Sequence, residues 1–186
     1  MDMYVNEIHD DIDHRELEKE LYKLISDHNL NDVEQISLTS LDGNDDWQSS
    51  TGKMRDLNHP ERYFSEINKS LKGTLIEQYI NRYSNYYRWR ILRLLPTRTY
   101  TIHQDGLTTA TNLRLHIPIV TNEKCFMCFY DSEPEHKLSS LVKHYHLKCG
   151  KSYETNTTRY HTAVNYGKTV RYHIVGVRYE NSDNRS

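Results

Sequence analysis

The hydrophobic pattern of this chain changes its period near Tyr86, and this change constrains the fold more than any other feature. Upstream of Tyr86, apolar side chains recur at helical spacing, whereas downstream they alternate with polar side chains, as in strands with one buried face. At 186 residues the chain fits one domain that can bury a substantial core. We therefore expect an α+β protein, a single domain over residues 1–186, in which a mainly helical layer (1–85) packs on a β core (86–180).

Three helices are expected in the first 85 residues, separated by a loop near residues 40–53. The first begins at a capping box formed by Asp13 and Glu16, the second begins around Pro60, and the third is capped by Thr74 and Glu77. The apolar side chains in register are Leu17, Leu21, Leu24 and Ile25 in the first helix, Phe64, Ile67 and Leu71 in the second, and Leu75, Tyr79, Ile80 and Tyr83 in the third.

Short strands separated by turns are expected throughout the second half. Beyond the strand that starts at Tyr86, the candidates are residues 98–103, 113–120, 124–130, 144–149, 157–164 and 169–179. Strands of this number and spacing favour a barrel or a sandwich, and the jelly roll (a double-stranded β-helix, cupin-like) is one standard solution.

Charge and cysteine content exclude several classes of protein. The formal net charge of −2 gives no basic footprint for nucleic acid. The chain has no apolar run long enough for a membrane helix and begins with an acidic stretch rather than a secretory signal, so we expect a cytoplasmic protein. Its three cysteines (Cys125, Cys128 and Cys149) are too few for a disulfide framework.

Two short motifs, one of cysteines and one of histidines, contain residue types that can bind a metal or take part in redox chemistry. Cys125 and Cys128 are three residues apart in a predicted strand, so their side chains point to opposite faces, and buried strand cysteines are the preferred interpretation. His144 and His146 share a strand face, where an ordinary surface or core role competes with metal binding.

The first signal of a metal centre is the stretch TIHQDG, which contains His103 and Asp105. Residues two apart in a strand point to one face, and His161 follows on a later predicted strand. Two imidazoles and a carboxylate occupy one face of an octahedral ion and leave positions open, as in non-haem Fe(II) oxygenases. The competing interpretation is a histidine at a strand end followed by ordinary Asp-Gly turn chemistry.

Two further strands each place an arginine and a histidine on the face opposite their aliphatic residues. Arg114 and His116 form one pair and Arg171 and His173 the other. An arginine that points into a barrel requires an anion, and a carboxylate suits its planar guanidinium. Alternatively, both faces contact water. The density of Tyr and Arg in residues 87–100 likewise leaves open whether Arg90, Arg93 or Tyr100 lines a pocket mouth or only packs the core.

The motifs HQD, LRLHIPI and HTAVNYGKTVRYHIV together resemble the aspartyl/asparaginyl β-hydroxylase-like branch of the 2-oxoglutarate and Fe(II) dioxygenases, over roughly residues 86–180. The resemblance implies that His103 and His161 bind iron, that Arg171 binds the distal carboxylate of 2-oxoglutarate, and that Arg114 and His116 lie near its C1 end. The best-known animal members have glycine where this chain has Asp105, which here completes the facial triad.

The resemblance implies a hydroxylase. Such an oxidoreductase uses Fe(II), O₂ and 2-oxoglutarate to hydroxylate an unactivated C–H bond of an amino-acid, peptide or protein side chain, and releases succinate and CO₂. Two alternatives remain at this point. One is a non-catalytic cupin-like protein that binds a metal or a small acid, and the other is a zinc-dependent hydrolase with the same ligands.

Overall fold

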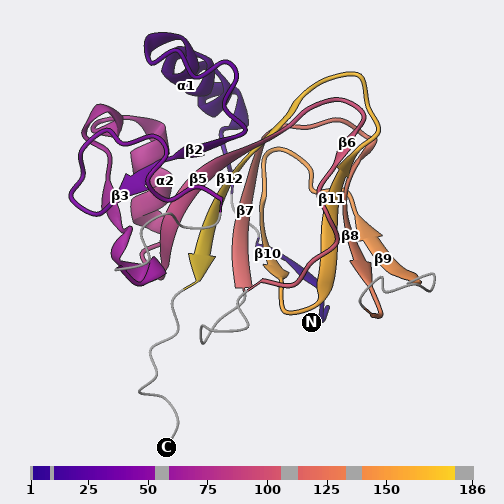
Figure 1. Ribbon diagram of the computed structural model, residues 1–186. Helices are drawn as coiled ribbons and strands as arrows, with labels where there is room; N and C mark the ends of the chain where they lie inside the picture. The colour runs from indigo at the N-terminus through magenta and orange to yellow at the C-terminus, as the bar shows by residue number, and fades with distance from the viewer. Residues whose placement is uncertain (1, 9–10, 53–58, 106–112, 133–139, 179–186) are drawn as a thin grey trace, which may run out of the picture.

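Two antiparallel sheets and two α-helices form the protein, as a computed structural model of residues 2–8, 11–52, 59–105, 113–132 and 140–178 shows (Figure 1). The six-stranded sheet lies between the helices on one side and the four-stranded sheet on the other. Its strand order is β1-β10-β7-β12-β5-β2, and that of the smaller sheet is β6-β11-β8-β9. The expected α+β class is confirmed, and the arrangement of the sheets is jelly-roll-like.

The strands are short, as the turn spacing predicts. The six-stranded sheet contains β1 (Val5–Ile8), β2 (Gln35–Ser37), β5 (Tyr86–Leu94), β7 (Leu113–Val120), β10 (Ser152–Asn156) and β12 (Arg171–Arg178). The four-stranded sheet contains β6 (Arg98–Thr99), β8 (Cys125–Tyr130), β9 (Leu141–Tyr145) and β11 (Tyr160–Asn165). A separate pair consists of β3 (Thr39–Ser40) and β4 (Glu66–Ile67).

Both α-helices begin where their capping residues predict. In α1 (His14–Asp27) the Asp13 side chain accepts a hydrogen bond from the backbone N–H of Glu16, and in α2 (Leu75–Arg82) Thr74 does the same for Glu77. Each cap satisfies one of the free N–H groups at a helix start. The buried face of α1 consists of Leu17, Leu21, Leu24 and Ile25, as expected.

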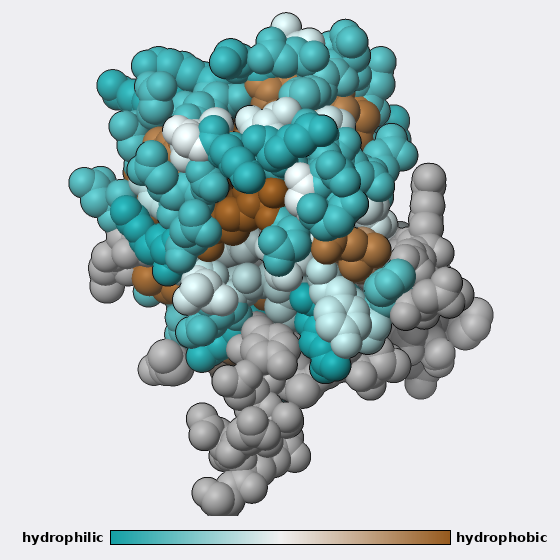
Figure 2. Space-filling view, turned by 90° about the vertical axis from the view of Figure 1, so that its left-hand side faces the viewer, coloured by the Kyte–Doolittle hydropathy of each residue, from teal (hydrophilic) through white to brown (hydrophobic). Residues whose placement is uncertain are grey.

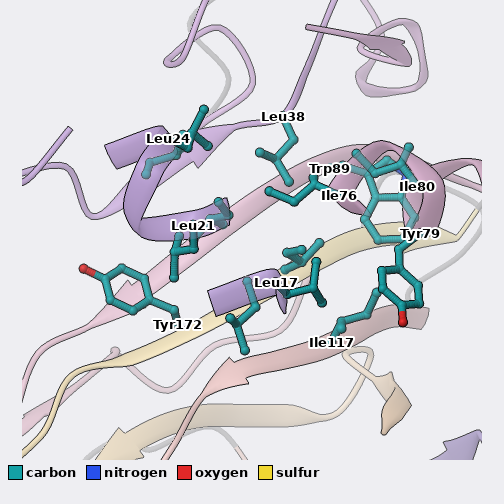
Figure 3. Close-up of a cluster of buried hydrophobic side chains, with 14 of the residues drawn as sticks. Leu17, Leu21, Leu24, Leu38, Ile76, Tyr79, Ile80, Trp89, Ile117 and Tyr172 are labelled. Atoms are coloured by element: carbon teal, nitrogen blue, oxygen red, sulfur yellow. The ribbon is translucent and has the colours of Figure 1, made fainter. Parts of the chain in front are cut away.

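The main core lies between these helices and the outer face of the six-stranded sheet, by which we mean the face that α1 covers. Figure 3 shows α1 leucines and α2 side chains packed over Trp89, Ile117 and Tyr172 of the sheet. Gly176 of β12 permits this packing, because a Cβ atom there would lie 2.9 Å from the Trp89 ring. The outer face is therefore the structural face of the sheet.

The expected mainly helical character of residues 1–85 is wrong in part. Between Pro60 and Lys72 the chain forms two 3₁₀ turns, η1 (Glu61–Tyr63) and η2 (Lys69–Leu71), with β4 between them. Beyond the short-range bonds of these turns, its backbone groups bond to other segments: the Phe64 carbonyl accepts from Arg88 N–H, and Asn68 N–H donates to the Leu38 carbonyl. The first 85 residues also contribute β1 and β2 to the main sheet.

Two strand predictions in the second half also need correction. The strand expected at 144–149 lies earlier, as β9, and β10 was not predicted because its sequence SYETN lacks an apolar alternation. Pairing with β1 and β7 on its two sides supplies the missing stabilisation of β10. Of residues 98–103, only β6 and an isolated bridge between His103 and His161 pair as a strand. Residues 106–112, 133–139 and 179–180 of the predicted core lie outside the described residues.

The surface on the helical side is largely hydrophilic, with hydrophobic side chains in small separate patches (Figure 2). None of the helices within the described ranges combines the length and the apolar character that a membrane span requires. All three cysteines are free, and Cys125 and Cys128 are buried.

Candidate metal centre and the polar inner face

His103, Asp105 and His161 converge on one point, and they form the one group of three or more potential metal ligands among the residues that the structure describes. One ligand atom from each lies within 4.8 Å of the others. A two-residue backbone bridge holds the histidines together: His103 N–H donates to the His161 carbonyl at 3.0 Å, and the reverse bond measures 2.9 Å. Asp105 N–H donates to the Thr157 carbonyl at 2.9 Å, which anchors the third side chain.

Backbone carbonyls orient both imidazoles. His103 Nδ1 lies 2.7 Å from the Thr101 carbonyl oxygen, and His161 Nδ1 lies 2.8 Å from that of Arg159. A carbonyl only accepts, so each Nδ1 carries the hydrogen and each Nε2 presents its lone pair. A hydrogen bond from the ring nitrogen that does not bind the metal is the usual way in which proteins orient metal-binding histidines. Burial also lowers the pKa of His161 to about 4, which keeps this ring neutral at physiological pH.

Asp105 lies between the two rings, with Oδ1 at 3.7 Å from His103 Nε2 and Oδ2 at 3.7 Å from His161 Nε2. Arg114 Nε contacts Oδ2 at 2.6 Å. Burial raises the pKa of Asp105, but the nearby charge of Arg114, together with His161 and His103, outweighs that effect and holds the pKa below its usual value. The carboxylate is therefore ionised, and the donor set of two imidazoles and one carboxylate fits a divalent iron ion.

The face of the six-stranded sheet opposite the helices, here called the inner face, carries the remaining predicted residues. Arg171, His173 and His116 are 3%, 1% and 4% exposed, so the interpretation that these side chains contact water is wrong. Tyr172 and Ile174, which alternate with them on β12, belong to the core of the outer face. The period-two pattern therefore assigned the two faces correctly.

Arg171 has no carboxylate partner among the ion pairs of the described residues. Its Nε and Nη2 lie 3.0 and 2.8 Å from the two ring nitrogens of His173, whereas its buried Nη1 has no hydrogen-bond partner. His116 Nε2 is likewise buried and without a partner. Arg171 and His173 line a small pocket together with Thr121, Cys125, Phe126, Met127 and Leu147. Buried donors without a partner are rare and need an explanation.

The structure gives different environments to Arg90, Arg93 and Tyr100, the three residues whose roles the sequence left open. Arg90 is buried and its Nη1 donates to Gln35 at 3.2 Å, Arg93 donates to the Asn31 carbonyl at the protein surface, and the Tyr100 hydroxyl donates to the Arg93 carbonyl at 3.1 Å. Arg90 therefore joins the inner face, and the partly buried Tyr100 packs against the hydrophobic cluster that contains Phe129. The ion pair between Asp105 and Arg114 was missed, because no sequence period relates a residue beyond a strand end to one on another strand.

The cysteine motif forms no metal group. Cys125 lines the pocket beside Arg171, whereas Cys128 lies on β8 one residue from Met127 and Phe129, whose side chains point to the inner core. The two thiols therefore point to opposite faces, as predicted. His144 is exposed and stacks edge-on against Phe126, and His146 Nδ1 contacts the Cys125 carbonyl at 3.0 Å.

The family model for aspartyl/asparaginyl β-hydroxylases matches residues 12–177. The chain belongs to this family. The resemblance drawn from the motifs is thereby confirmed, and membership supports an oxygenase of the 2-oxoglutarate and Fe(II) type. The match begins at residue 12, so the expectation that the family likeness starts near Tyr86 is wrong. It includes α1 and α2, which cover the outer face of the six-stranded sheet, whose inner face carries Arg171 and His116.

One solved structure, AviO1, shares the fold at low sequence identity. AviO1 from Streptomyces viridochromogenes is 11% identical and superimposes with a TM-score of 0.54 over 96% of this chain and 90% of its own. An oxidoreductase of the 2OG-Fe(II) oxygenase family from Burkholderia pseudomallei is 16% identical, with a TM-score of 0.40 over 54% of this chain and 47% of that one. The carbocyclase SnoK from nogalamycin biosynthesis, described as non-haem and α-ketoglutarate-dependent, is 17% identical, with a TM-score of 0.38 over 53% and 55%. The chain thus spans about half the length of these two. No curated protein sequence matches the chain.

Proposed function

We propose that the protein is an Fe(II)- and 2-oxoglutarate-dependent dioxygenase that hydroxylates an unactivated C–H bond of an amino-acid or peptide side chain and releases succinate and CO₂. One observation carries the proposal. A triad of His103, Asp105 and His161, with both Nε2 lone pairs free, shares an interior with two buried polar atoms that lack a hydrogen-bond partner among the described residues, Arg171 Nη1 and His116 Nε2. A metal and an anion together account for both features.

His103, Asp105 and His161 would hold the iron, and bound iron would supply the activation of O₂ for oxidation of the substrate. The chain's own contribution is to orient and to neutralise charge. Backbone carbonyls fix the histidine tautomers, and Arg114 steers the Asp105 carboxylate through their 2.6 Å contact. Arg114 would also lie near the C1 end of the co-substrate.

Arg171 would bind the distal carboxylate of 2-oxoglutarate through Nη1, and His116 would donate from Nε2. A guanidinium binds a carboxylate through planar, charge-assisted hydrogen bonds, and burial strengthens them by excluding water. The residues that line the pocket beside Arg171 are mostly apolar, which suits the methylene groups of a dicarboxylate. We further propose that the described residues form one domain with a double-stranded β-helix as its core.

Anaerobic titration tests the proposal directly. The protein is titrated with Fe(II) and then with 2-oxoglutarate, and a weak visible charge-transfer band should appear only when both are present. The His103→Ala protein should lose the band, whereas His144→Ala, which removes an exposed imidazole outside the site, should retain it. If 2-oxoglutarate does not bind in the presence of Fe(II), the proposal is wrong.

Turnover distinguishes an oxygenase from a binding protein. In air, with Fe(II), ascorbate and 2-oxoglutarate, we expect oxygen-dependent succinate release, which pools of peptides and free amino acids should stimulate. Binding of both ligands without succinate release from any pool would favour a non-catalytic binding protein. Activity with Zn²⁺ and without oxygen would instead favour a hydrolase.

A further inference from the structure

Arg90 is a buried arginine to which the proposed function assigns no task. It lies on β5 opposite Val175 of β12, on the inner face, and is 6% exposed. Its Nη1 donates to the Gln35 side chain at 3.2 Å, whereas its buried Nε has no hydrogen-bond partner. A buried donor without a partner is rare and costs free energy, so this nitrogen needs an explanation.

The charges around Arg90 do not balance. Arg88 pairs with Glu61, and Arg114 pairs with Asp105, whereas Arg90 has no carboxylate partner among the ion pairs of the described residues. Burial, followed by the charges of Arg88 and Arg114, lowers the pKa of Arg90, and the charge of the metal ligand Asp105 acts in the opposite direction. A guanidinium stays protonated in proteins even so. A positive charge is therefore buried within electrostatic range of the metal centre, and such a charge is costly until an anion pairs with it.

The backbone of β5 is strained next to Arg90. Between the pairs Arg90–Val175 and Tyr87–Val177, β5 has two residues and β12 has one, so β5 forms a β-bulge beside its neighbour β12 (Figure 1). Arg88 in this bulge has a φ of 50°, a left-handed conformation that costs free energy in a residue other than glycine. Bulges redirect side chains and are common beside active sites. The strain therefore supports a functional role for this part of β5.

Gln35 orients the Arg90 guanidinium without neutralising it. The Gln35 Oε1 atom accepts hydrogen bonds from Arg90 Nη1 and from the backbone N–H of Gly52, the second at 2.9 Å. An amide oxygen is an uncharged acceptor, so it fixes direction and leaves the positive charge in place. An oriented guanidinium with an uncompensated charge and a free Nε is suited to bind an anion.

Arg171, to which the proposed function assigns the distal carboxylate of 2-oxoglutarate, lies elsewhere on the inner face. It pairs with Leu94, which is four residues from Arg90 on β5. At about 3.3 Å per residue, the two backbone positions are about 13 Å apart along the strand direction. The charges that act most strongly on Arg90 are those of Arg88 and Arg114 rather than that of Arg171. Arg90 and Arg171 therefore require two different anions.

We propose that Arg90 binds a carboxylate of the substrate, so that the protein selects acids over their neutral analogues. The inference deepens the proposed function and rests on it for the reaction. The α-carboxylate of a free amino acid and the acidic side chain of a peptide both present the planar group that a guanidinium binds. Asp105 lies within electrostatic range of Arg90, which would hold the bound acid on the side of the interior where the metal ligands converge.

The first test compares acids with matched neutral compounds in the wild-type protein. Isothermal titration calorimetry, anaerobically with Fe(II) and 2-oxoglutarate, is applied to free amino acids, their carboxamides, and capped tripeptides with a central acidic residue or its amide. An acid should bind about ten-fold or more tightly than its amide, because only the acid forms charge-assisted bonds. Binding of free amino acids alone would identify an α-carboxylate, and binding of the acidic peptides an acidic side chain. Equal binding of acids and amides, or no binding of any acid, would overturn the proposal.

The second test removes the guanidinium. Arg90→Met should weaken binding of the preferred acid about ten-fold or more and abolish its advantage over the amide. Arg90→Lys, which retains the positive charge, should keep that advantage. The control is Arg82→Gln, which removes an exposed arginine on α2 and should behave as wild type. In succinate release, Arg90→Met should raise KM for the acid with kcat within about three-fold of wild type, since the lost contact is present before and during the reaction.

Affinities for Fe(II) and 2-oxoglutarate separate the inference from the proposed function. Both should be close to wild type in Arg90→Met, and a large loss of 2-oxoglutarate affinity would assign Arg90 to the co-substrate and overturn the inference. Wild-type acid binding by a folded Arg90→Met protein would also overturn it and leave the oxygenase assignment in place. If the wild type does not bind 2-oxoglutarate, the assignment fails, and the comparison of acids and amides with the metal-free protein still decides whether Arg90 binds an anion. If Arg90→Met does not fold, Arg90→Gln takes its place with the same expected loss.

Discussion

The two faces of the six-stranded sheet differ in the side chains that they bury, although the same strands form both faces: the outer face buries apolar side chains and the inner face buries polar ones. On the outer face, Trp89, Ile117 and Ile174 pack under α1 and α2 with almost no exposure. On the inner face, Arg171 and His116 are buried as deeply, yet each has an atom without a hydrogen-bond partner. Burial by itself therefore does not show that a residue is structural: the outer face is packed with apolar side chains, whereas the inner face has buried polar atoms without a partner among the described residues.

Two buried arginines, Arg88 and Arg171, differ in the same way in the hydrogen-bond partners of their guanidinium groups. Arg88 is buried near a loop, where Nε donates to the Ser50 carbonyl at 2.9 Å, Nη2 donates to the Gly52 carbonyl at 2.7 Å, and Nη1 pairs with Glu61. Every part of its guanidinium has a partner. Arg171 is buried too, but its Nη1 has none. The satisfied arginine supports the fold, and the unsatisfied one fits a binding role.

The largest expected effect is on the outer face. Ile117→Ala should lower the free energy of unfolding by about 2–5 kcal/mol, because it removes fully buried methyl groups and leaves a cavity beside Ile174. Urea denaturation measures the loss. At temperatures where the variant is still folded, its affinity for 2-oxoglutarate should match wild type. A large loss of affinity in the folded variant would break the division between the two faces.

The next largest effect is expected on the inner face, where a substitution should weaken ligand binding. Arg171→Ala should weaken 2-oxoglutarate binding roughly ten- to a hundred-fold, as expected for loss of a charge-assisted hydrogen bond worth about 1.5–3 kcal/mol. Fe(II) binding should remain close to wild type, since Arg171 contacts none of the three ligands in the described hydrogen bonds and ion pairs. Unchanged affinity would move the carboxylate anchor to another residue, with Arg114 as the first candidate.

Acid should destabilise the protein through its buried histidines. His161 has a folded-state pKa of about 4, below the value of about 6.5 in an unfolded chain, so the unfolded state takes up a proton first as pH falls. The loss therefore begins near pH 6.5 and is complete near pH 4. From pH 7 to pH 5, His161 alone accounts for about 2 kcal/mol, and His116 and His173 act in the same direction. Urea denaturation at the two pH values measures this loss of unfolding free energy. Equal midpoints would contradict the conclusion that the buried histidines are neutral.

The smallest effect distinguishes the two classes of buried arginine. Arg90 lies on the inner face with Nε unpartnered, and burial, with the nearby charges of Arg88 and Arg114, lowers its pKa. Arg90→Met should raise the free energy of unfolding by about 1 kcal/mol, because it removes a buried charge that has no carboxylate partner. Arg88→Met is the matched control and should be destabilising. A destabilised Arg90→Met protein would place Arg90 with the structural arginines.

Much of this could be predicted from the sequence, because it depends on neighbours along the chain. The caps of α1 and α2, the alternation on β7 and β12, and the opposite orientation of Cys125 and Cys128 each follow from the period of a single element. The prediction from hydrophobic periodicity was wrong at residues 60–72, where the spacing of the apolar residues indicated a helix. There several backbone donors and acceptors bond to segments that lie far away in the sequence, and no local pattern encodes that choice.

The sequence by itself determined which residue types the site would contain and which strand faces would carry them. Only the tertiary structure decided that His103 pairs with His161, that Asp105 turns between their rings, and that Arg114 contacts its carboxylate. It also decided that Arg171 Nη1 and Arg90 Nε lack a hydrogen-bond partner among the described residues, whereas every part of the Arg88 guanidinium has one. The physical reason is that convergence of side chains depends on strand pairing across long separations in the chain, and strand order is set by packing of the whole sheet rather than by any one segment.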